Sequence, residues 1–203
     1  MKKTFLAALL SASCMSANAG VIFSDNFDSE VPDVLVQTGS DTNYTSFTNW
    51  TVSEGTVDLV ANGDWSLECA GNTGKCVDLD GSTGNAGIFT SIDLLLDAGT
   101  YSLSFDVSGN QRNGSNDTVD LILGGILDKT ITLNGNDPWT TISYIFTVNS
   151  ATTDNLIFNH TGGDNIGILL DNVSIASVPE PGTLALLGLG LAGLTVARRR
   201  KAA

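Results

Sequence analysis

Tyr101-Ser102-Leu103-Ser104-Phe105-Asp106-Val107 alternates apolar and polar side chains along its length. Successive side chains of a β-strand point to opposite faces, so this period of two predicts a strand that buries one face in a core. Three further segments, residues 119–123, 130–133 and 142–148, repeat the alternation. Together these segments predict an all-β domain.

Turn-forming clusters separate the predicted strands. Gly, Asn, Asp and Ser are concentrated at residues 81–85, 109–116, 134–138 and 161–165, where they supply positive φ angles and side-chain to backbone hydrogen bonds. No amphipathic helix of ordinary length precedes residue 178. Many short strands at this spacing predict a β-sandwich or jelly roll.

The order of the strand motifs along the chain resembles that of a known family of domains. Along the chain they are residues 23–28, 50–52, 55–60, 77–81, 96–105, 139–146 and 168–175. This series resembles the galactose-binding-like jelly-roll domains, which include many carbohydrate-binding modules and many surface domains. The resemblance spans most of residues 21–176, and it implies a jelly-roll β-sandwich over residues 20–177.

The first 19 residues form a predicted signal peptide. A basic start is followed by an apolar core at residues 5–10 and by Ala17-Asn18-Ala19, an A-x-A cleavage site. Cys14 leaves lipoprotein processing as an alternative, but residues 11–13 lack the aliphatic residue expected three positions before that cysteine. We therefore expect export, with cleavage after Ala19.

The other end of the chain combines three signals. Val178-Pro179-Glu180-Pro181-Gly182 precedes an apolar run at residues 183–197, and Arg198-Arg199-Arg200-Lys201 follows it. A helix of this length spans about 23 Å, less than the roughly 30 Å hydrocarbon core of a bilayer, so it would thin the membrane or rely on snorkelling arginines. A buried core helix is the alternative, but nothing could bury a run that is apolar all round and ends in four cations. We expect a single transmembrane helix whose basic end stays cytoplasmic.

Pro-Glu-Pro, a short apolar helix and an arginine cluster resemble the PEP-CTERM sorting signal of Gram-negative bacteria. The resemblance covers residues 178–203 and implies processing by exosortase, an integral membrane protease and transpeptidase, at or near the motif at 179–181. The implied route is export across the inner membrane, transient anchoring, and release to the cell surface or an extracellular matrix. The residues that carry this signal are Pro179, Glu180, Pro181, Arg198, Arg199 and Arg200.

The charge of residues 20–178 is strongly negative. This segment holds 21 of the 22 acidic residues and three basic residues, Lys75, Arg112 and Lys129, which gives a net charge of −18. A phosphate backbone would be repelled, so we expect no nucleic-acid partner. Divalent cations are the natural counterions, although solubility in an extracellular setting would account for most of these acids.

Cys69 and Cys76 are the only cysteines left after the signal peptide is removed. Exported proteins meet an oxidising environment, so the pair predicts a disulfide. Closing this loop of eight residues would stabilise the fold by about 2.5 kcal/mol in the chain-entropy model. A metal site is the alternative, but no histidine or second cysteine pair lies nearby in the sequence.

The jelly-roll resemblance also implies a structural Ca²⁺. In many such domains an acidic residue near the first strand and an Asp in the last strand hold this ion, and the matching positions are Asp28 and Asp171. First and last strands are commonly neighbours in this fold, and Ca²⁺ prefers oxygen ligands. The alternative is that Asp171 only accepts hydrogen bonds from turn amides.

Trp65 is the predicted sugar platform. Sugars stack their C–H faces on aromatic rings while polar side chains bind their hydroxyl groups, and Trp65 lies in loop-like sequence at residues 62–66. Trp50 and Trp139 lie at the starts of predicted strands, so we expect both in the core. The polar side chains that could assist Trp65 are Asn62, Asp64 and Asn110 or Arg112.

Catalysis has little support in the sequence. The one histidine, His160, lies in a turn-like stretch where we expect it to be solvated. The chain lacks G-x-S-x-G, H-E-x-x-H, EF-hand and C-x-x-C motifs. With 21 acidic residues on one domain, some pair of carboxylates would lie by chance at the separation that glycosidases use. Such a pair therefore does not indicate catalysis.

Three functions follow from these features. We predict a cell-surface or exopolysaccharide-associated matrix protein without catalytic activity. A carbohydrate-binding module that recognises extracellular polysaccharide is the alternative, and a glycan hydrolase is the remote one. An exposed aromatic groove would favour the second, and a deep cleft with a buried carboxylate of raised pKa would favour the third.

Overall fold

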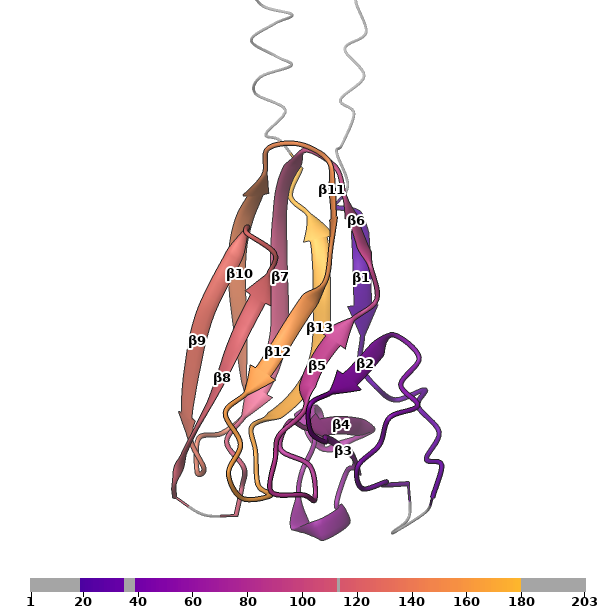
Figure 1. The fold of residues 1–203 in the computed structure, drawn as a ribbon, viewed down its shortest axis with the longest axis vertical. Coiled ribbons are helices and arrows are strands. Elements are labelled where there is room, and N and C mark those ends of the chain that lie inside the picture. Colours follow the sequence, from indigo (N-terminus) through magenta and orange to yellow (C-terminus); the bar gives the residue numbers. More distant parts are fainter. Residues whose placement is uncertain (1–18, 35–38, 113, 180–203) are drawn as a thin grey trace, which may run out of the picture. The chain divides into compact units, whose positions relative to one another are not determined.

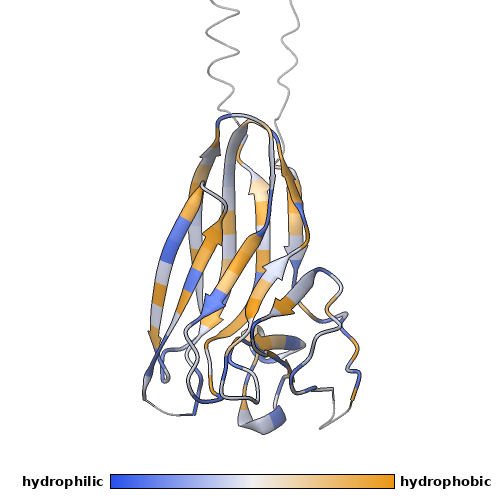
Figure 2. Cartoon of the chain, viewed as in Figure 1, coloured by the Kyte–Doolittle hydropathy of each residue, from blue (hydrophilic) through white to orange (hydrophobic). Residues whose placement is uncertain are grey.

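The alternating segment at 101–107 lies within β7 (Gly99–Ser108), the longest strand of the described residues. β7 buries Tyr101, Leu103, Phe105 and Val107 and directs the intervening side chains to its partly exposed face. Figure 2 shows the same banding of hydrophobic and hydrophilic segments along the neighbouring strands. The predicted period of two is confirmed in this strand.

A computed structural model of the chain describes residues 19–34, 39–112 and 114–179. Within it, Gly20–Val178 form one compact unit. The predicted signal peptide, apart from its last residue, the predicted transmembrane helix at 183–197 and the basic stop at 198–201 lie outside the described residues. In the part of the chain that is described, no helix has the length and hydropathy needed to cross a bilayer.

The strands of the described residues are short and pair antiparallel, and two single-turn 3-10 helices lie among them (Figure 1). In chain order the elements are β1 (Val21–Asp25), β2 (Trp50–Ser53), β3 (Asp58–Ala61), η1 (Asp64–Ser66), η2 (Ala70–Asn72), β4 (Lys75–Asp78), β5 (Ile88–Ser91), β6 (Leu94–Leu96), β7 (Gly99–Ser108), β8 (Asn116–Leu123), β9 (Leu127–Asn134), β10 (Thr140–Val148), β11 (Thr152–Asp154), β12 (Leu156–His160) and β13 (Leu169–Ser177).

Two main sheets form the two layers of the domain (Figure 1). One has the order β10-β7-β13-β4-β3, with β1 also paired to β13, and the other has the order β2-β5-β12-β8-β9. The sheets pack face to face through their apolar sides, where the rings of Phe105 on β7 and Phe158 on β12 meet edge to face at 5.3 Å. The predicted jelly-roll β-sandwich is confirmed.

β13 organises the first sheet because it pairs with three other strands. β7 runs along one side of β13, while β4 and β1 share the other side. The first and last strands are therefore neighbours, as predicted. The backbone N–H of Ser177 donates to the carbonyl of Gly20 at 2.8 Å, so the two ends of the domain lie side by side.

An aromatic cluster fills the core between the sheets. Trp50 is 2% exposed, stacks on Phe89 with ring centroids 4.4 Å apart, and contacts Phe27 at 6.1 Å. Its indole N–H donates to the buried Asp25 carboxylate at 3.0 Å, which satisfies the one polar atom of the ring. The core position predicted for Trp50 is confirmed.

His160 is not solvated, contrary to the expectation from its turn-like sequence. It ends β12, pairs with Val119 of β8, and is 6% exposed. Burial lowers its pKa to about 4, against a smaller opposing effect of the Asp164 charge. The sequence motifs predict no strand at residues 156–160, where the structure pairs β12 with β8 and buries this side chain.

Candidate ligand-binding site

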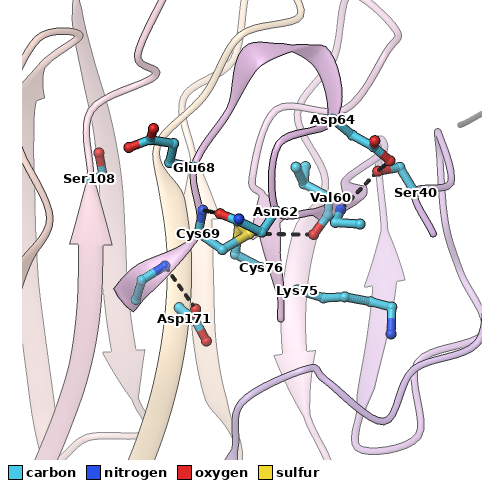
Figure 3. Close-up of a disulfide and its surroundings, with 12 residues drawn as sticks. Ser40, Val60, Asn62, Asp64, Glu68, Cys69, Lys75, Cys76, Ser108 and Asp171 are labelled. Atoms are coloured by element: carbon cyan, nitrogen blue, oxygen red, sulfur yellow. Dashed lines mark hydrogen bonds between the residues drawn. A yellow bond between two sulfur atoms is a disulfide. The ribbon is translucent and has the colours of Figure 1, made fainter. Parts of the chain in front are cut away.

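A disulfide shapes the loop between β3 and β4. Cys69 and Cys76 are bonded, with Cα atoms 5.5 Å apart, and the predicted disulfide is confirmed. The loop closes at its base where the amide of Asn62 donates to the carbonyl of Gly74 at 2.9 Å. The Asn62 side chain also accepts from the amide of Cys69 at 3.0 Å (Figure 3). This cross-linked loop is therefore a fixed part of the surface.

The loop is fastened to two other segments through the backbone of Glu68. The indole N–H of Trp139 donates to the Glu68 carbonyl at 2.7 Å. The Gln111 side chain accepts from the Glu68 amide at 2.8 Å and donates to the same carbonyl at 2.9 Å. The first bond orients the Trp139 indole, and the other two hold the Glu68 backbone. The Glu68 carboxylate is left exposed, on the side of the loop that faces Ser108 (Figure 3).

A groove of about 320 Å³ lies where these segments meet. We call it the Trp139 groove. Half-buried Trp139 offers an aromatic surface, while Glu68 and Asn136 are exposed polar side chains at its edge. An aromatic face beside amide and carboxylate groups is the chemistry that binds sugars. Its lining residues are Glu68, Ser108, Gln111, Gly135, Asn136, Asp137, Pro138 and Trp139.

Three further grooves of the described domain have linings without an aromatic side chain. One, of about 540 Å³, is lined by serine, asparagine and aspartate side chains and by Val173. Two more, of about 420 Å³ and 340 Å³, are lined by polar and aliphatic residues. A groove lined only by polar side chains binds sugar hydroxyl groups weakly, because water competes for the same hydrogen bonds. The Trp139 groove is therefore the candidate ligand site, although it is the smallest of the four.

Trp65 lies close to this region but does not line the groove. Its ring is half-buried against a small second core made by the disulfide and nearby apolar side chains. The predicted helpers of Trp65 are engaged elsewhere: Asp64 accepts from Ser40 at 2.6 Å, and Asn110 donates to Asp117 at 2.8 Å. A sugar-binding role for Trp65 stays a prediction.

Trp139 differs from the core position that the sequence predicts, because its ring is only partly buried. It packs on the second core with one side and lines the groove with the rest. Trp139 comes directly after the turn-rich segment 134–138, and this position in the sequence could have predicted an exposed side chain. Gln111 could not have been found in this way, because its partner Glu68 is 43 residues away in the sequence.

The predicted calcium ligands lie near each other, since the Asp28 charge contributes to raising the pKa of Asp171. Their oxygens already accept hydrogen bonds: Asp28 from the Lys75 amide at 2.8 Å, and Asp171 from the amides of Ala70 and Asn172 at 3.2 and 2.7 Å. The Lys75 ammonium also donates to the Asp28 carbonyl at 2.8 Å. Calcium binding at this pair stays a prediction. A carboxylate that accepts one or two hydrogen bonds keeps further lone pairs for coordinating an ion.

Three buried carboxyl groups of the described residues have raised pKa values. Burial is the main cause at Asp78, whose pKa lies well above its usual value, at Asp80, where it is about 6, and at Asp171, where it is about 7. None of the three lines any of the four grooves.

Comparison with protein families identifies the C-terminal segment. The PEP-CTERM protein-sorting motif matches residues 177–201, which indicates export and exosortase-dependent sorting of this chain. Of the matched residues, 180–201 lie outside the described structure. A comparison with curated proteins finds no match.

Comparison with solved structures shows the fold. The CBM22-1 xylan-binding domain of Paenibacillus barcinonensis Xyn10C aligns with 15% identity and a TM-score of 0.51, covering 82% of this chain and 100% of that domain. The CBM6cm-2 module of Cellvibrio mixtus lichenase 5A, solved with cellotriose, aligns with 16% identity and a TM-score of 0.42, covering 78% and 99%. At 15% identity the likeness to the xylan-binding domain concerns the fold alone.

Proposed function

We propose that this protein binds extracellular polysaccharide at the Trp139 groove and is a non-catalytic component of the cell surface or matrix. The observation that carries the proposal is the oriented, half-exposed indole of Trp139 beside the exposed Glu68 and Asn136 side chains. The ring would stack on the apolar face of a sugar, and the polar side chains would take its hydroxyl groups.

The rigidity of the groove supports binding over a structural role for these residues. The Trp139 ring is fixed by its bond to Glu68, and the loop that carries Glu68 is cross-linked at Cys69. A preformed site loses little conformational entropy on binding. Neighbouring folds that include a xylan-binding domain are consistent with this use of the jelly roll.

The sorting tail supports the class of ligand. An exosortase-sorted protein is delivered outside the cell, where polysaccharide is abundant and nucleotides and metabolites are scarce. The net charge of −18 on residues 20–178 disfavours strongly anionic polymers. We therefore propose a neutral or weakly charged polysaccharide as the ligand.

Affinity electrophoresis of residues 20–178 in gels that contain neutral plant or bacterial polysaccharides tests the proposal. We expect one or more polymers to retard the wild type. Trp139→Ala should weaken retardation at least about tenfold, the equivalent of ~1.4 kcal/mol of stacking. Trp139→Tyr, which keeps an aromatic face, should retain most of the binding.

Trp65→Ala is the matched control because that ring packs on the same small core without lining the groove. It should leave retardation unchanged. Loss of binding in Trp65→Ala with retention in Trp139→Ala would favour the site predicted from sequence and overturn the groove. Far-UV circular dichroism would show that each variant keeps its strands.

A further inference from the structure

Asp80 is the one carboxylate of the described residues with both oxygens buried and without a hydrogen-bond partner. Its side chain is 1% exposed and follows the end of β4. The amide of Asp164 lies close to it, but no donor reaches either oxygen with hydrogen-bond geometry. A buried ionised carboxylate without a partner is destabilising, so such a group either takes up a proton or gains a cation.

Other carboxylates surround this orphan group. Asp164, Asp117 and Asp58 all act on Asp80 as negative charges. Asp164 also raises the pKa of Asp117, after the larger effect of burial. Asp80 therefore faces a region of concentrated negative charge.

The backbone around Asp80 packs closely against the neighbouring β12–β13 loop. Asp78 accepts from the amides of Asp80 at 3.1 Å and Gly167 at 2.9 Å. A Cβ on Gly167 would lie 2.5 Å from the Asp80 nitrogen. The β12–β13 loop, which carries Asp164, is thus packed directly against the Asp78–Asp80 segment.

We propose that Asp80 and Asp164 bind a divalent cation, Ca²⁺, between the end of β4 and the β12–β13 loop. A calcium ion would supply the missing partner for both Asp80 oxygens and offset the mutual repulsion of Asp80, Asp164 and Asp117. Hard oxygen ligands suit Ca²⁺, and an exported protein meets this ion at millimolar concentration.

No three acidic, histidine or cysteine side chains of the described residues form a ready-made metal centre. Backbone carbonyls and water must therefore complete the coordination of the ion. A site with few charged ligands binds in the range of about 10⁻⁴ to 10⁻³ M that is typical of extracellular modules. The site differs from the predicted pair Asp28 and Asp171 in its buried ligand. Asp80 has no hydrogen-bond partner, whereas Asp28 and Asp171 both accept backbone hydrogen bonds. Asp164 also accepts from the amides of Asn165 and Ile166, at 2.7 and 3.0 Å, through one of its oxygens.

Thermal melting of residues 20–178 in 10 mM CaCl₂ and in chelator tests the proposal. We expect Ca²⁺ to raise the melting temperature of the wild type by about 3–6 °C, given a millimolar affinity and a domain of this size. Asp80→Asn should lose this increase and should melt higher than the wild type in chelator, because a neutral amide replaces a buried charge. Asp164→Asn, on an exposed loop, should lose most of the increase and provides the same test if Asp80→Asn does not fold.

Asp171→Asn and NaCl of equal ionic strength are the controls. Asp171→Asn should keep the Ca²⁺ response; if it loses the response while Asp80→Asn keeps it, the ion binds at the predicted pair and the proposal is wrong. An equal increase with NaCl would mean that charge screening alone acts on this acidic domain. A wild-type melting temperature that is the same in Ca²⁺ and chelator would likewise overturn the site and would indicate a protonated Asp80.

Discussion

Asp171 lies in β13 with 3% of its surface exposed, between the charges of Asp28 and Asp106. Burial and then these charges raise its pKa to about 7, against the lowering effect of two backbone hydrogen bonds. Its carboxyl group therefore binds a proton more tightly in the folded protein than in the unfolded chain. The protonation of one residue couples directly to the stability of the domain.

The sign of this coupling gives a prediction for calcium-free buffer. Where the folded state binds more protons, the free energy of unfolding falls as pH rises, so Asp171 should lower stability between about pH 4 and about pH 7. Asp171→Asn should flatten this slope by at most about 1.4 kcal/mol per pH unit, the limit for one proton. Urea titrations at several pH values measure it.

Asp128→Asn is the control, since Asp128 is exposed and the variant should keep the wild-type slope. His160 opposes Asp171: its pKa is lowered from 6.5 to about 4, so its stabilising effect is present above pH 6.5 and is lost as pH falls toward 4. An Asp171→Asn variant with an unchanged slope would show that its carboxyl group is not buried in solution.

Single residues show where the sequence was insufficient. Trp50 could be placed in the core from its position in a strand, but Trp139 in a similar position is half-exposed. The difference depends on contacts from distant segments, such as the Phe89 ring on Trp50 and the Glu68 backbone carbonyl at the Trp139 indole. Hydropathy within one segment carries no information about such contacts.

At the scale of elements, β7 gives a test of the alternation on which the fold prediction depends. Phe105 is fully buried between the sheets against Phe158, while its neighbour Ser104 points to the other face. Phe105→Ala should lower the free energy of unfolding by about 3–5 kcal/mol. Ser104→Ala should change it by less than about 0.5 kcal/mol. Similar effects of the two variants in urea unfolding would contradict the assigned faces.

The disulfide loop is the second element with a measurable role. Replacing both Cys69 and Cys76 by serine should lower the free energy of unfolding by about 2.5 kcal/mol, because the unfolded chain regains the entropy of an eight-residue loop. Polysaccharide retardation should also weaken, because the loop carries the Glu68 wall of the Trp139 groove. Reduction of the wild type should reproduce both effects. Unchanged binding in the double variant would separate the loop from the site.

At the scale of the whole molecule, strands were easier to predict than their arrangement. The alternating segments at 101–107, 119–123 and 142–148 all lie in strands, because alternation is a local property. The division of one side of β13 between β4 and β1 is a pairing across the whole chain. No local pattern encodes such a pairing. The resemblance to known jelly rolls anticipated only that the first and last strands are neighbours.

At the same scale, the sorting motif at residues 177–201 predicts removal of the C-terminal segment during export, and this removal can be measured. If exosortase processes the chain near Pro179, Glu180 and Pro181, the mature protein from native cells should lack the arginine cluster at 198–200. Replacing those three arginines by serine should leave the chain unprocessed, because a short apolar helix without a basic end loses its fixed orientation in the membrane. Replacing Lys75 by serine, within the folded domain, should have no effect on processing. Mass spectrometry of the C-terminal peptide decides between these outcomes: a wild-type mature chain that still ends after Arg200 would show that the motif is not cleaved.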